Sequence, residues 1–525
     1  MRHIKTSTVA LVLALTISLV ACTKLDEKLN STLTESQASG ILLSSTDVSV
    51  LLQACYDGLQ TFQNQDGPTS LEENSSDESL VPTRGGDWDD NGVWRVIHTH
   101  SWNADHAQVG NSFNGLLGIV FNTTNTLTFK PSASQAAEAR FIRAFAMYTV
   151  LDLYGQVPFR QPGENLLNAP KVLSGTEAID FIISELTAIQ NDLPNGPSAG
   201  GLAYKANKDA CKVFLMKCYL NKGVYSNRAA PTFAAGDMTN VITLADQIIN
   251  TNKYALSNSV FDNYAPSNTT SVNENIFTNL NIGGSKGGGV RSTWYKTLHY
   301  NNNKSSWNGF STLAEVYDRF EATDTRRGVA YKDPNNAVAN YPNPANAINT
   351  GFLIGQQYDW VTGAALQDRK SAPLAFTRAV AVQESGTNLE VTGIRVLRYP
   401  IDASPNNDGQ ADNDYVFFRY ADVLLMKAEA QFRSGSAPAA LITVNALRVK
   451  RGASLLTALT AQNLLDERQR EFYWDGWRRQ DMVRFGTFLA ARTLKPAASD
   501  PKYLLYPIPN AALAVNPNLK QNPGY

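Results

Sequence analysis

The sequence predicts a mostly α fold, in which TPR-like pairs of antiparallel helices form a scaffold that carries a large, irregular, loop-rich subdomain. Two observations support this prediction. Segments before residue 257 and after residue 414 have apolar residues at helical spacing, with alanines where paired helices would approach closely. Between Ser257 and Asp414 the composition shifts to Asn, Gly, Ser and Pro, over a stretch too long for one structureless loop.

The first residues have the pattern of a secretory signal. Basic residues near the N-terminus precede an apolar run over 9–21, which is too short to cross a bilayer as a helix. The run ends in LVAC, which is similar to the bacterial lipobox, where cleavage leaves Cys22 as a lipid-bearing N-terminus. The alternative is an ordinary secretory signal with a chance cysteine. We expect residues 1–21 to be a signal peptide, Cys22 to be lipidated and residues 22–35 to form a tether.

The next residues bear on the location. Lys24, Asp26 and Glu27 follow Cys22 as in a surface-export signal of some Gram-negative lipoproteins. More than one acyl chain anchors a protein stably, and no later run of about 18 apolar residues is present to cross the membrane. We therefore expect a lipid-anchored protein whose chain does not cross the membrane.

Composition and charge favour a folded globular protein. Hydrophobic residues make up 43% of the chain and charged residues 18%. The chain has 46 Lys plus Arg against 47 Asp plus Glu, so it lacks the basic excess of a nucleic-acid binder. Besides Cys22 there are Cys55, Cys211 and Cys218, an odd number that argues against a disulfide framework. The last two lie too far apart on one predicted helix to bridge, and we expect both to be buried.

Four helices are predicted in the first half of the chain, over 136–154, 177–193, 208–222 and 237–250. In the first, aromatic and aliphatic residues recur at helical spacing, and Ser174-Gly175-Thr176 is typical of a start for the second. We expect the first helix to pair with the second, and the third with the fourth.

Three helices are predicted near the C-terminus, over 420–434, 438–451 and 461–485, and the first two of these should form a third pair. Trp474 and Trp477 lie three residues apart in the last helix, a spacing at which both rings can face the core. Strands are predicted at 394–398 and 416–419.

The stretch PTRGGDWDDNGVWRVIHTHSW, residues 82–102, gathers three of the eight tryptophans among charged residues. Residues 87–92 copy the D-x-D-x-N-G opening of an EF-hand, but the Glu expected at the twelfth position is His98. Local turns made by Asp and Asn are the simpler explanation. We expect no metal or other cofactor. A structural calcium site of looser composition than an EF-hand is kept as the alternative.

Motifs for zinc binding and catalysis are not recognisable. His98, His100 and His106 do not have a zinc spacing, and we interpret them as hydrogen-bonded structural histidines. No motif selects a pair of carboxylates for glycoside cleavage, and no cysteine has a convincing His partner. We therefore expect a protein that is not an enzyme.

Tryptophans in predicted loops indicate a surface that holds flat ligands. A flat ring can cover the C–H face of a sugar, while neighbouring Asp, Asn, Arg and Gln bind its hydroxyls. Arg84 would add a rigid fork of donors. The alternative is that these rings plug and stabilise the loops. The tryptophans concerned are Trp88, Trp94, Trp102, Trp294, Trp307 and Trp360.

Six stretches together resemble the SusD/RagB family of outer-membrane nutrient-binding lipoproteins. They are the lipobox, PTRGGDWDDNGVWRVIHTHSW, AEARFIRAFAMYTVLDLYGQVPF, FFRYADVLLMKAEAQFRSG, DERQREFYWDGWRRQDMVRFG and the ending YLLYPIPNAALAVNPNLKQNPGY. The resemblance implies a SusD-like α-α superhelix of four TPR-like units, in regions 36–256 and 415–525, with a variable ligand-binding region over 257–414. It also implies a non-enzymatic role beside a SusC-like TonB-dependent channel in the outer membrane, facing the cell exterior.

The resemblance also suggests where a ligand would bind. The PTRG turn and its surroundings match the family's binding face, and a second aromatic cluster, STWYKTLHYNNNKSSWNG, matches it weakly. The predicted ligand-binding residues are Asp77, Arg84, Trp88, Trp102, Asn103, Trp294, Tyr295, Tyr300 and Trp307.

Two functions remain open at this point. The first is capture of an oligosaccharide for the channel, which the loop aromatics and carboxamides favour. The second is capture of a peptide or protein on the same scaffold. A peptide binder would be expected to carry a charged clamp for the chain termini, and the sequence shows no such clamp. The near-zero net charge favours a neutral glycan over a strongly anionic one.

Overall fold

The computed structural model describes residues 47–197, 202–286, 289–303, 305–404 and 410–525. The predicted signal peptide, the lipidated Cys22 and the tether over 22–35 lie outside these residues. Residues 47–525 form one packed unit. None of the helices in the described residues is both long and apolar enough to span a membrane.

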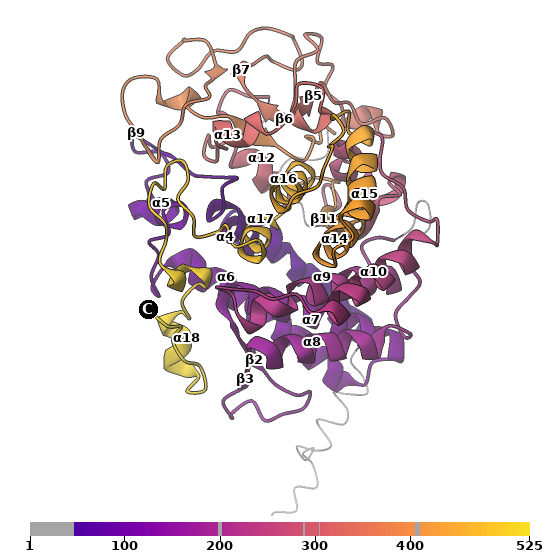
Figure 1. The fold of residues 1–525 in the computed structure, drawn as a ribbon. Helices are drawn as coiled ribbons and strands as arrows, with labels where there is room; N and C mark the ends of the chain where they lie inside the picture. Colours follow the sequence, from indigo (N-terminus) through magenta and orange to yellow (C-terminus); the bar gives the residue numbers. More distant parts are fainter. Residues whose placement is uncertain (1–46, 198–201, 287–288, 304, 405–409) are drawn as a thin grey trace, which may run out of the picture. The chain divides into compact units, whose positions relative to one another are not determined.

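Eight helices pack in a row, each against the next, and form the scaffold (Figure 1). The confirmed pairs are α7 with α8, α9 with α10 and α14 with α15, and the described chain adds α3 and α6 before them. These helices are α3 (Val48–Gly58), α6 (Ala107–Thr126), α7 (Ala133–Tyr154), α8 (Gly175–Ile189), α9 (Lys208–Ser226), α10 (Ala235–Ile249), α14 (Tyr420–Arg433) and α15 (Ala437–Lys450).

Helix α7 shows how local signals and packing define an element of this scaffold. Ser132 and Gln135 form a reciprocal capping box at its start, and Gly155 ends it with a φ of 75°. Phe141, Phe145 and their helical neighbours are fully buried. Cys211 and Cys218 lie buried on α9 as free thiols, as expected from the sequence.

The predicted helix over 461–485 is wrong in one respect, because the chain breaks it into α16 (Ala461–Phe472) and α17 (Arg478–Arg484). Between them Trp474 and Gly476 have φ values of 60° and 80°, which a continuous helix does not allow. Asp475 in this turn accepts hydrogen bonds from Arg398, so tertiary contacts fix the break. Trp474 is nevertheless buried, as predicted.

The sequence suggested that the stretch over 82–102 is a loop, and this is only partly right. After α4 (Pro68–Asn74) it contains β1 (Thr83–Arg84), the 3-10 turn η2 (Asp90–Gly92) and the short helix α5 (Val93–His98). Trp94 therefore lies on a helix, and its ring is buried.

The irregular region over 257–414 consists of short helices and strands. Most of them lie at the top of Figure 1, whereas β4 packs against α9. Its helical turns are η4 (Val260–Tyr264), α11 (Asn268–Ser271), α12 (Arg291–Tyr295), α13 (Ala314–Asp318), η5 (Thr325–Arg327), η6 (Ala337–Ala339) and η7 (Leu389–Val391). Its strands are β4 (Asn275–Asn279), β5 (Gly328–Val329), β6 (Thr350–Leu353), β7 (Gly355–Gln356), β8 (Ala375–Phe376), β9 (Gln383–Glu384) and β10 (Arg395–Leu397).

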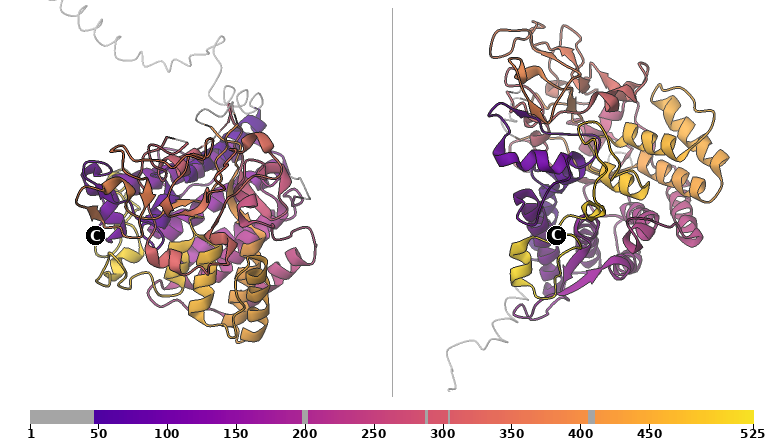
Figure 2. Two further views of the ribbon diagram at one scale, coloured as in Figure 1. Left: turned by 90° about the horizontal axis from the view of Figure 1, so that it is seen from above. Right: turned by 60° about the vertical axis from the view of Figure 1, so that its left-hand side comes forward.

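Figure 2 gives two further views of the fold. Two of the small sheets join this region to the rest of the chain. Strand β6 pairs antiparallel with β10 and β5, and β4 pairs antiparallel with β11 (Tyr415–Arg419). Strand β1 pairs parallel with β9, and β7 pairs with β8. A hairpin of β2 (Gln156–Phe159) and β3 (Lys171–Ser174) follows α7. The chain ends with η8 (Pro501–Leu504) and α18 (Asn510–Val515). Both predicted strands are thus confirmed, as β10 and β11.

Candidate functional site

Tyr295 and Trp307 form a stacked pair at the surface of the irregular region. Their ring centroids are 5.2 Å apart with an interplanar angle of 24°. Trp307 is 44% exposed, and Tyr295 is half-buried. Arg291, one helical turn before Tyr295 on α12, is exposed and lies 5.6 Å from the centroid of the Tyr295 ring. We call Arg291, Tyr295 and Trp307 the aromatic surface.

The loop that carries Trp307 folds back onto α12. The Trp307 N–H donates to the carbonyl of Tyr295 at 2.7 Å, and Asn308 N–H donates to Leu298 at 2.9 Å. These two backbone bonds bring Trp307 beside Tyr295 although the two residues are twelve positions apart in sequence. The stack is therefore a consequence of the backbone path.

Arg84 supports this loop from beneath. Its buried guanidinium donates to the carbonyls of Asn308 at 2.7 Å and Gly309 at 2.6 Å, and to the hydroxyl of Ser311 at 2.9 Å. Burial lowers the pKa of Arg84 to about 10. The structure therefore places Arg84 as a support of the loop, with its donors already engaged by protein oxygens.

Trp88 also lies under the loop. Its indole N–H donates to the carbonyl of Trp307 at 2.7 Å. Its ring packs edge-on against Trp94 and Phe310, with centroid distances of 5.3 Å and 5.7 Å. A Cβ on Gly309 would lie 2.4 Å from the Trp88 ring, so only glycine fits there. Trp88 is half-buried and holds the backbone of Trp307 in place.

Tyr300 belongs to a neighbouring cluster of charged groups. Its hydroxyl donates to Asp87 at 2.6 Å, and the guanidinium of Arg369 covers its ring at 3.9 Å from the centroid. Burial and Asp87 raise the pKa of Tyr300 to about 12. Arg369 also pairs with Glu390 at 2.7 Å. One face and the hydroxyl of Tyr300 are thus occupied by protein groups.

Tyr341 is a partly buried aromatic residue of the irregular region. Burial, Asp359 and Asp402 raise the pKa of Tyr341 to about 12, with a smaller contribution from Tyr295. Its ring packs against Trp360, whose backbone N–H donates to Asn303. Trp360 itself is buried.

Four predicted residues lie elsewhere. Asp77 is buried and accepts from Arg478 at 2.7 Å and Arg319 at 2.9 Å, and these arginines hold its pKa well below its usual range. Trp102 is 2% exposed and donates to the Tyr525 hydroxyl at 2.7 Å, beside the exposed Asn103.

Trp294 is the fourth of these residues. It is 1% exposed, and its indole N–H donates to the carbonyl of Tyr399 at 2.9 Å. As placed here, neither the Trp102 nor the Trp294 ring offers an open face to a ligand, and both act as plugs in the core. The sequence therefore led to Tyr295 and Trp307 but not to Arg291. Arg291 could have been found, because it precedes Tyr295 by one helical turn.

The EF-hand-like loop uses its carboxylates for side-chain contacts. Asp87 accepts from Tyr300, Asp89 pairs with Arg95 at 2.5 Å, and Asp90 accepts from Trp94 at 2.7 Å. Within the described residues, no group of three or more His, Cys, Asp and Glu side chains is placed to hold a metal ion.

The three histidines near this loop each have hydrogen-bond partners. His98 is bonded to the carbonyl of Ser79 and His100 to that of Ser75, and His106 accepts from the backbone of Val109 at the start of α6. Burial lowers the pKa of His98 to about 4 and that of His100 to about 2, so both are neutral at pH 7.

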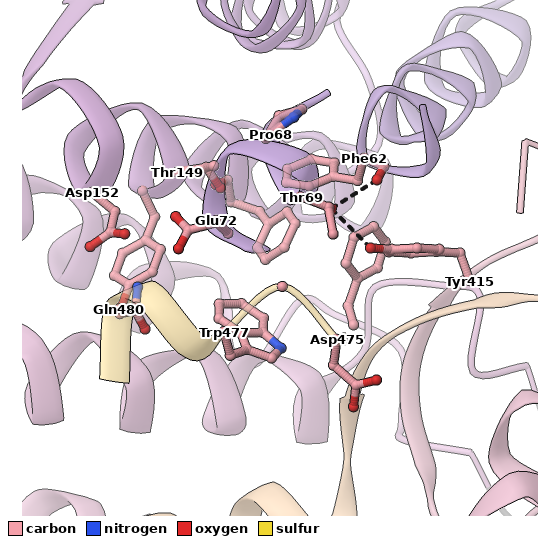
Figure 3. A pocket seen from close by; sticks show the side chains of 14 residues that line it. Phe62, Pro68, Thr69, Glu72, Thr149, Asp152, Tyr415, Asp475, Trp477 and Gln480 are labelled. Atoms are coloured by element: carbon pink, nitrogen blue, oxygen red, sulfur yellow. Dashed lines mark hydrogen bonds between the residues drawn. The ribbon is translucent and has the colours of Figure 1, made fainter. Parts of the chain in front are cut away.

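A small internal cavity lies where α4, α7 and β11 meet the turn before α17 (Figure 3). The hydroxyl of Thr69 donates to the carbonyl of Phe62 at 2.8 Å and is hydrogen-bonded to Tyr415 at 2.9 Å. Burial and the nearby Asp152 raise the pKa of Glu72 in its wall. The cavity has a volume of about 30 Å³, which suits a water molecule and is far too small for a sugar ring.

Comparison with known proteins agrees with this architecture. Residues 251–525, just over half of the chain, match the family described as the SusD family. The starch-binding protein SusD of Bacteroides thetaiotaomicron is 27% identical over 429 residues, which cover 77% of this chain and 75% of that protein.

Solved structures show the same fold. A SusD superfamily protein from Parabacteroides distasonis has a TM-score of 0.69 at 16% identity, covering 94% of this chain and 100% of its own. Surface glycan-binding protein A from Bacteroides thetaiotaomicron, solved with laminarihexaose, has a TM-score of 0.61 at 18% identity, covering 90% and 98% of the two chains. The row of paired helices, the irregular region beside it and the sequence match lead to one conclusion: this protein belongs to the SusD family.

Proposed function

We propose that this protein captures oligosaccharides on the aromatic surface and does not cleave them. The observation that carries the proposal is the stacked pair of Tyr295 and Trp307, because Trp307 leaves 44% of its surface exposed on a braced loop. An exposed indole can cover the C–H face of a sugar ring. Arg291 is exposed beside the Tyr295 ring and can donate to hydroxyls at the edge of the sugar.

The relatives support a carbohydrate ligand. One is a starch-binding protein, and a protein of the same fold has been solved with laminarihexaose. The near-zero net charge of this chain favours a neutral oligosaccharide. Within the chain, the region over 257–414 would select the ligand, and the helical regions over 36–256 and 415–525 would support it.

Family membership and the N-terminal motif support a cellular location and a transport role for this protein. We propose that the protein is anchored in the outer membrane through lipidated Cys22 and faces the cell exterior. There it would pass its ligand to a SusC-like TonB-dependent channel.

Replacing Trp307 by Ala tests the binding site. Loss of one aromatic contact should cost about 1–3 kcal/mol of binding free energy, or roughly a ten- to hundredfold loss of affinity. The measurement is calorimetry with a panel of neutral oligosaccharides. Thermal melting should change little, because the Trp307 ring is largely outside the core.

Phe121→Ala is the matched control, since Phe121 is another exposed aromatic residue but lies on α6. Its affinity for oligosaccharides should equal that of the wild type. If the wild type binds no oligosaccharide but binds members of a peptide panel, the peptide hypothesis replaces this one. If the oligosaccharides become shorter on incubation, the absence of cleavage is disproved.

The lipid anchor is tested by Cys22→Ala. We expect a folded protein that leaves the membrane fraction, because no acylated cysteine remains to hold it. Fractionation after a high-salt wash gives the result. A Cys22→Ala protein that stays with the membranes would contradict the proposed anchor.

A further inference from the structure

Glu390 of η7 is bonded to the chain on both sides of the exposed Trp307. Its carboxylate is hydrogen-bonded to the ring of His299 at 2.9 Å, and its main-chain carbonyl accepts from the side chain of Asn308 at 2.9 Å. His299 and Asn308 are both buried, and Asn308 follows Trp307 directly. One residue thus holds the backbone before and after the indole that is proposed to meet the ligand.

The hydrogen bonds of His299 determine which of its ring nitrogens carries the proton. The backbone N–H of Asn301 donates to Nδ1 at 3.1 Å, so Nδ1 must be unprotonated. The neutral ring therefore carries its proton on Nε2, which donates to the carboxylate of Glu390. The backbone N–H of His299 donates to the side chain of Asn302 at 2.8 Å, and Asn302 N–H donates back to the His299 carbonyl at 3.1 Å. The turn over residues 299–302 is thus built around a neutral imidazole.

A second proton on His299 is incompatible with this turn. It would sit on Nδ1 and face the N–H of Asn301, so two donors would point at each other and the backbone N–H would lose its acceptor. Burial lowers the pKa of His299. Glu390 opposes this shift, whereas Arg395 and Arg369 add to it. The turn is therefore fully stabilised above the ordinary pKa of 6.5 and weakens as the pH falls below that value.

The charged groups around His299 leave its own proton as the variable one near neutral pH. Burial raises the pKa of Glu390, but hydrogen bonds from the backbone and side chain of Arg369 outweigh this, and the net shift is downward from 4.5. Glu390 is therefore charged at pH 5 and above. The charged and titratable groups that pack around the ring are Glu390 of η7, Arg369 before β8, Arg395 of β10, and Tyr300 with its partner Asp87.

His299 is coupled to Trp307 through its neighbours in the chain. Leu298 directly precedes His299, and its carbonyl accepts from the N–H of Asn308 at 2.9 Å. Asn308 in turn follows Trp307, whose N–H donates to Tyr295. A movement of the His299 turn is therefore transmitted by one hydrogen bond to the residue next to the exposed indole.

We propose that His299 and Glu390 are positioning residues for the oligosaccharide site, and that they make its affinity sensitive to acid. At neutral pH the uncharged ring of His299 keeps Trp307 beside Tyr295, and the aromatic surface holds its ligand. Protonation of the ring opens the turn, disturbs the stacked pair and weakens binding. This inference rests on the proposed function, because it concerns the same surface.

A titration of affinity against pH tests the role of His299. The measurement is calorimetry with maltohexaose and laminarihexaose from pH 7.5 to pH 5. We expect the wild type to lose affinity about tenfold over this range, a usual size for coupling between two sites. His299→Asn keeps an acceptor for the Asn301 N–H but does not titrate, so its affinity should be nearly independent of pH. The two proteins are compared by their change with pH, not by their absolute affinities.

His106→Asn is the matched control. His106 is also buried, its Nδ1 also accepts from a backbone N–H, that of Val109, and burial also lowers its pKa. Its other ring nitrogen is bonded to Val93, so neither bond involves the segment that carries Trp307. The affinity of His106→Asn should fall with pH as that of the wild type does. If circular dichroism shows that His299→Asn is unfolded, His299→Gln replaces it, since glutamine keeps a donor and does not titrate either.

Hydrogen exchange without ligand tests the turn by itself. At pH 7.5, the amides over residues 300–303 should exchange at similar rates in the wild type and in His299→Asn. At pH 5 they should exchange about fivefold faster in the wild type, the value of one lost hydrogen bond. Comparing the two proteins at the same pH removes the intrinsic effect of pH on exchange.

Two results would overturn the proposal. One is a wild-type affinity that changes with pH no more than that of His299→Asn, because the acid-sensitive group would then be another one or absent. The other is equal exchange of the two proteins at pH 5, which would show that the turn does not respond to the proton. If neither oligosaccharide binds the wild type at any pH, the proposed function fails, and the exchange measurement still decides whether His299 controls the turn.

Discussion

At the scale of single residues, burial separates side chains that hold loops from those that can meet a ligand. Arg84 and Trp88 were predicted to touch the ligand, and the structure shows them bonded to the backbone of the loop that presents Trp307. Residue type alone does not distinguish these roles, because a donor that binds a sugar hydroxyl equally well binds a carbonyl. The direction of the side chain, which only the fold determines, makes the difference.

Arg84→Lys tests the supporting role. A lysine keeps the charge but cannot supply the fork that reaches the carbonyls of Asn308 and Gly309 together. We expect faster amide hydrogen exchange over residues 305–311 and about tenfold weaker oligosaccharide binding, with a stability loss of about 1–3 kcal/mol from unmade buried hydrogen bonds. Exchange is measured by mass spectrometry, and affinity by calorimetry.

Arg95→Lys is the control for this experiment, because Arg95 forms a partly exposed pair with Asp89 nearby. Its exchange and affinity should match the wild type. A normal exchange rate over 305–311 together with weakened binding in Arg84→Lys would mean that Arg84 acts on the ligand directly, as the sequence first suggested.

At the scale of elements, the sequence predicted those helices in which apolar residues recur at helical spacing over several turns. Helix α7 and its partner α8 have such a period, and they pack together although the β2–β3 hairpin lies between them in sequence. Helix α6 could not be predicted in this way. Its sequence, AQVGNSFNGLLGIVFNTTNT, is rich in Gly, Asn and Thr, which are poor helix formers, and packing against α3 and α7 stabilises it.

The irregular region shows the other limit of sequence analysis. Strands β5 and β7 have two residues each, and the partners of β1 and β11 lie far away in sequence. Elements this short have no period of their own, so long-range contacts define them. For the same reason, the sequence located the candidate site in a region but could not say which rings there are exposed.

At the scale of the whole molecule, buried ion pairs join the irregular region to the helices. Glu471 on α16 pairs with Arg326 of η5 at 3.0 Å, Arg419 of β11 at 2.6 Å and Arg451 after α15 at 2.8 Å. All four side chains are almost fully buried. One carboxylate thus connects three segments that are distant in sequence, and the three guanidiniums offset the cost of its burial.

Glu471→Gln should therefore destabilise the whole described unit. Removing one charge leaves three buried guanidiniums with too little negative charge, which costs about 3–5 kcal/mol for a broken buried pair. Urea unfolding followed by circular dichroism measures the loss. Glu177→Gln is the control, since Glu177 forms an exposed pair with Lys171 and should change stability by less than about 1 kcal/mol.

The pH dependence of this loss distinguishes the charge from the shape of Glu471. The neighbouring arginines hold the pKa of Glu471 well below its usual value of 4.5, so the folded protein binds fewer protons there than the unfolded chain. The stabilisation is complete above about pH 5 and decreases as the pH falls below the unfolded value. The difference between wild type and Glu471→Gln should accordingly be largest at pH 7 and shrink toward pH 3. A difference that stays constant over this range would show that glutamine fails through packing, and that the ion pairs do not hold the irregular region to the helices.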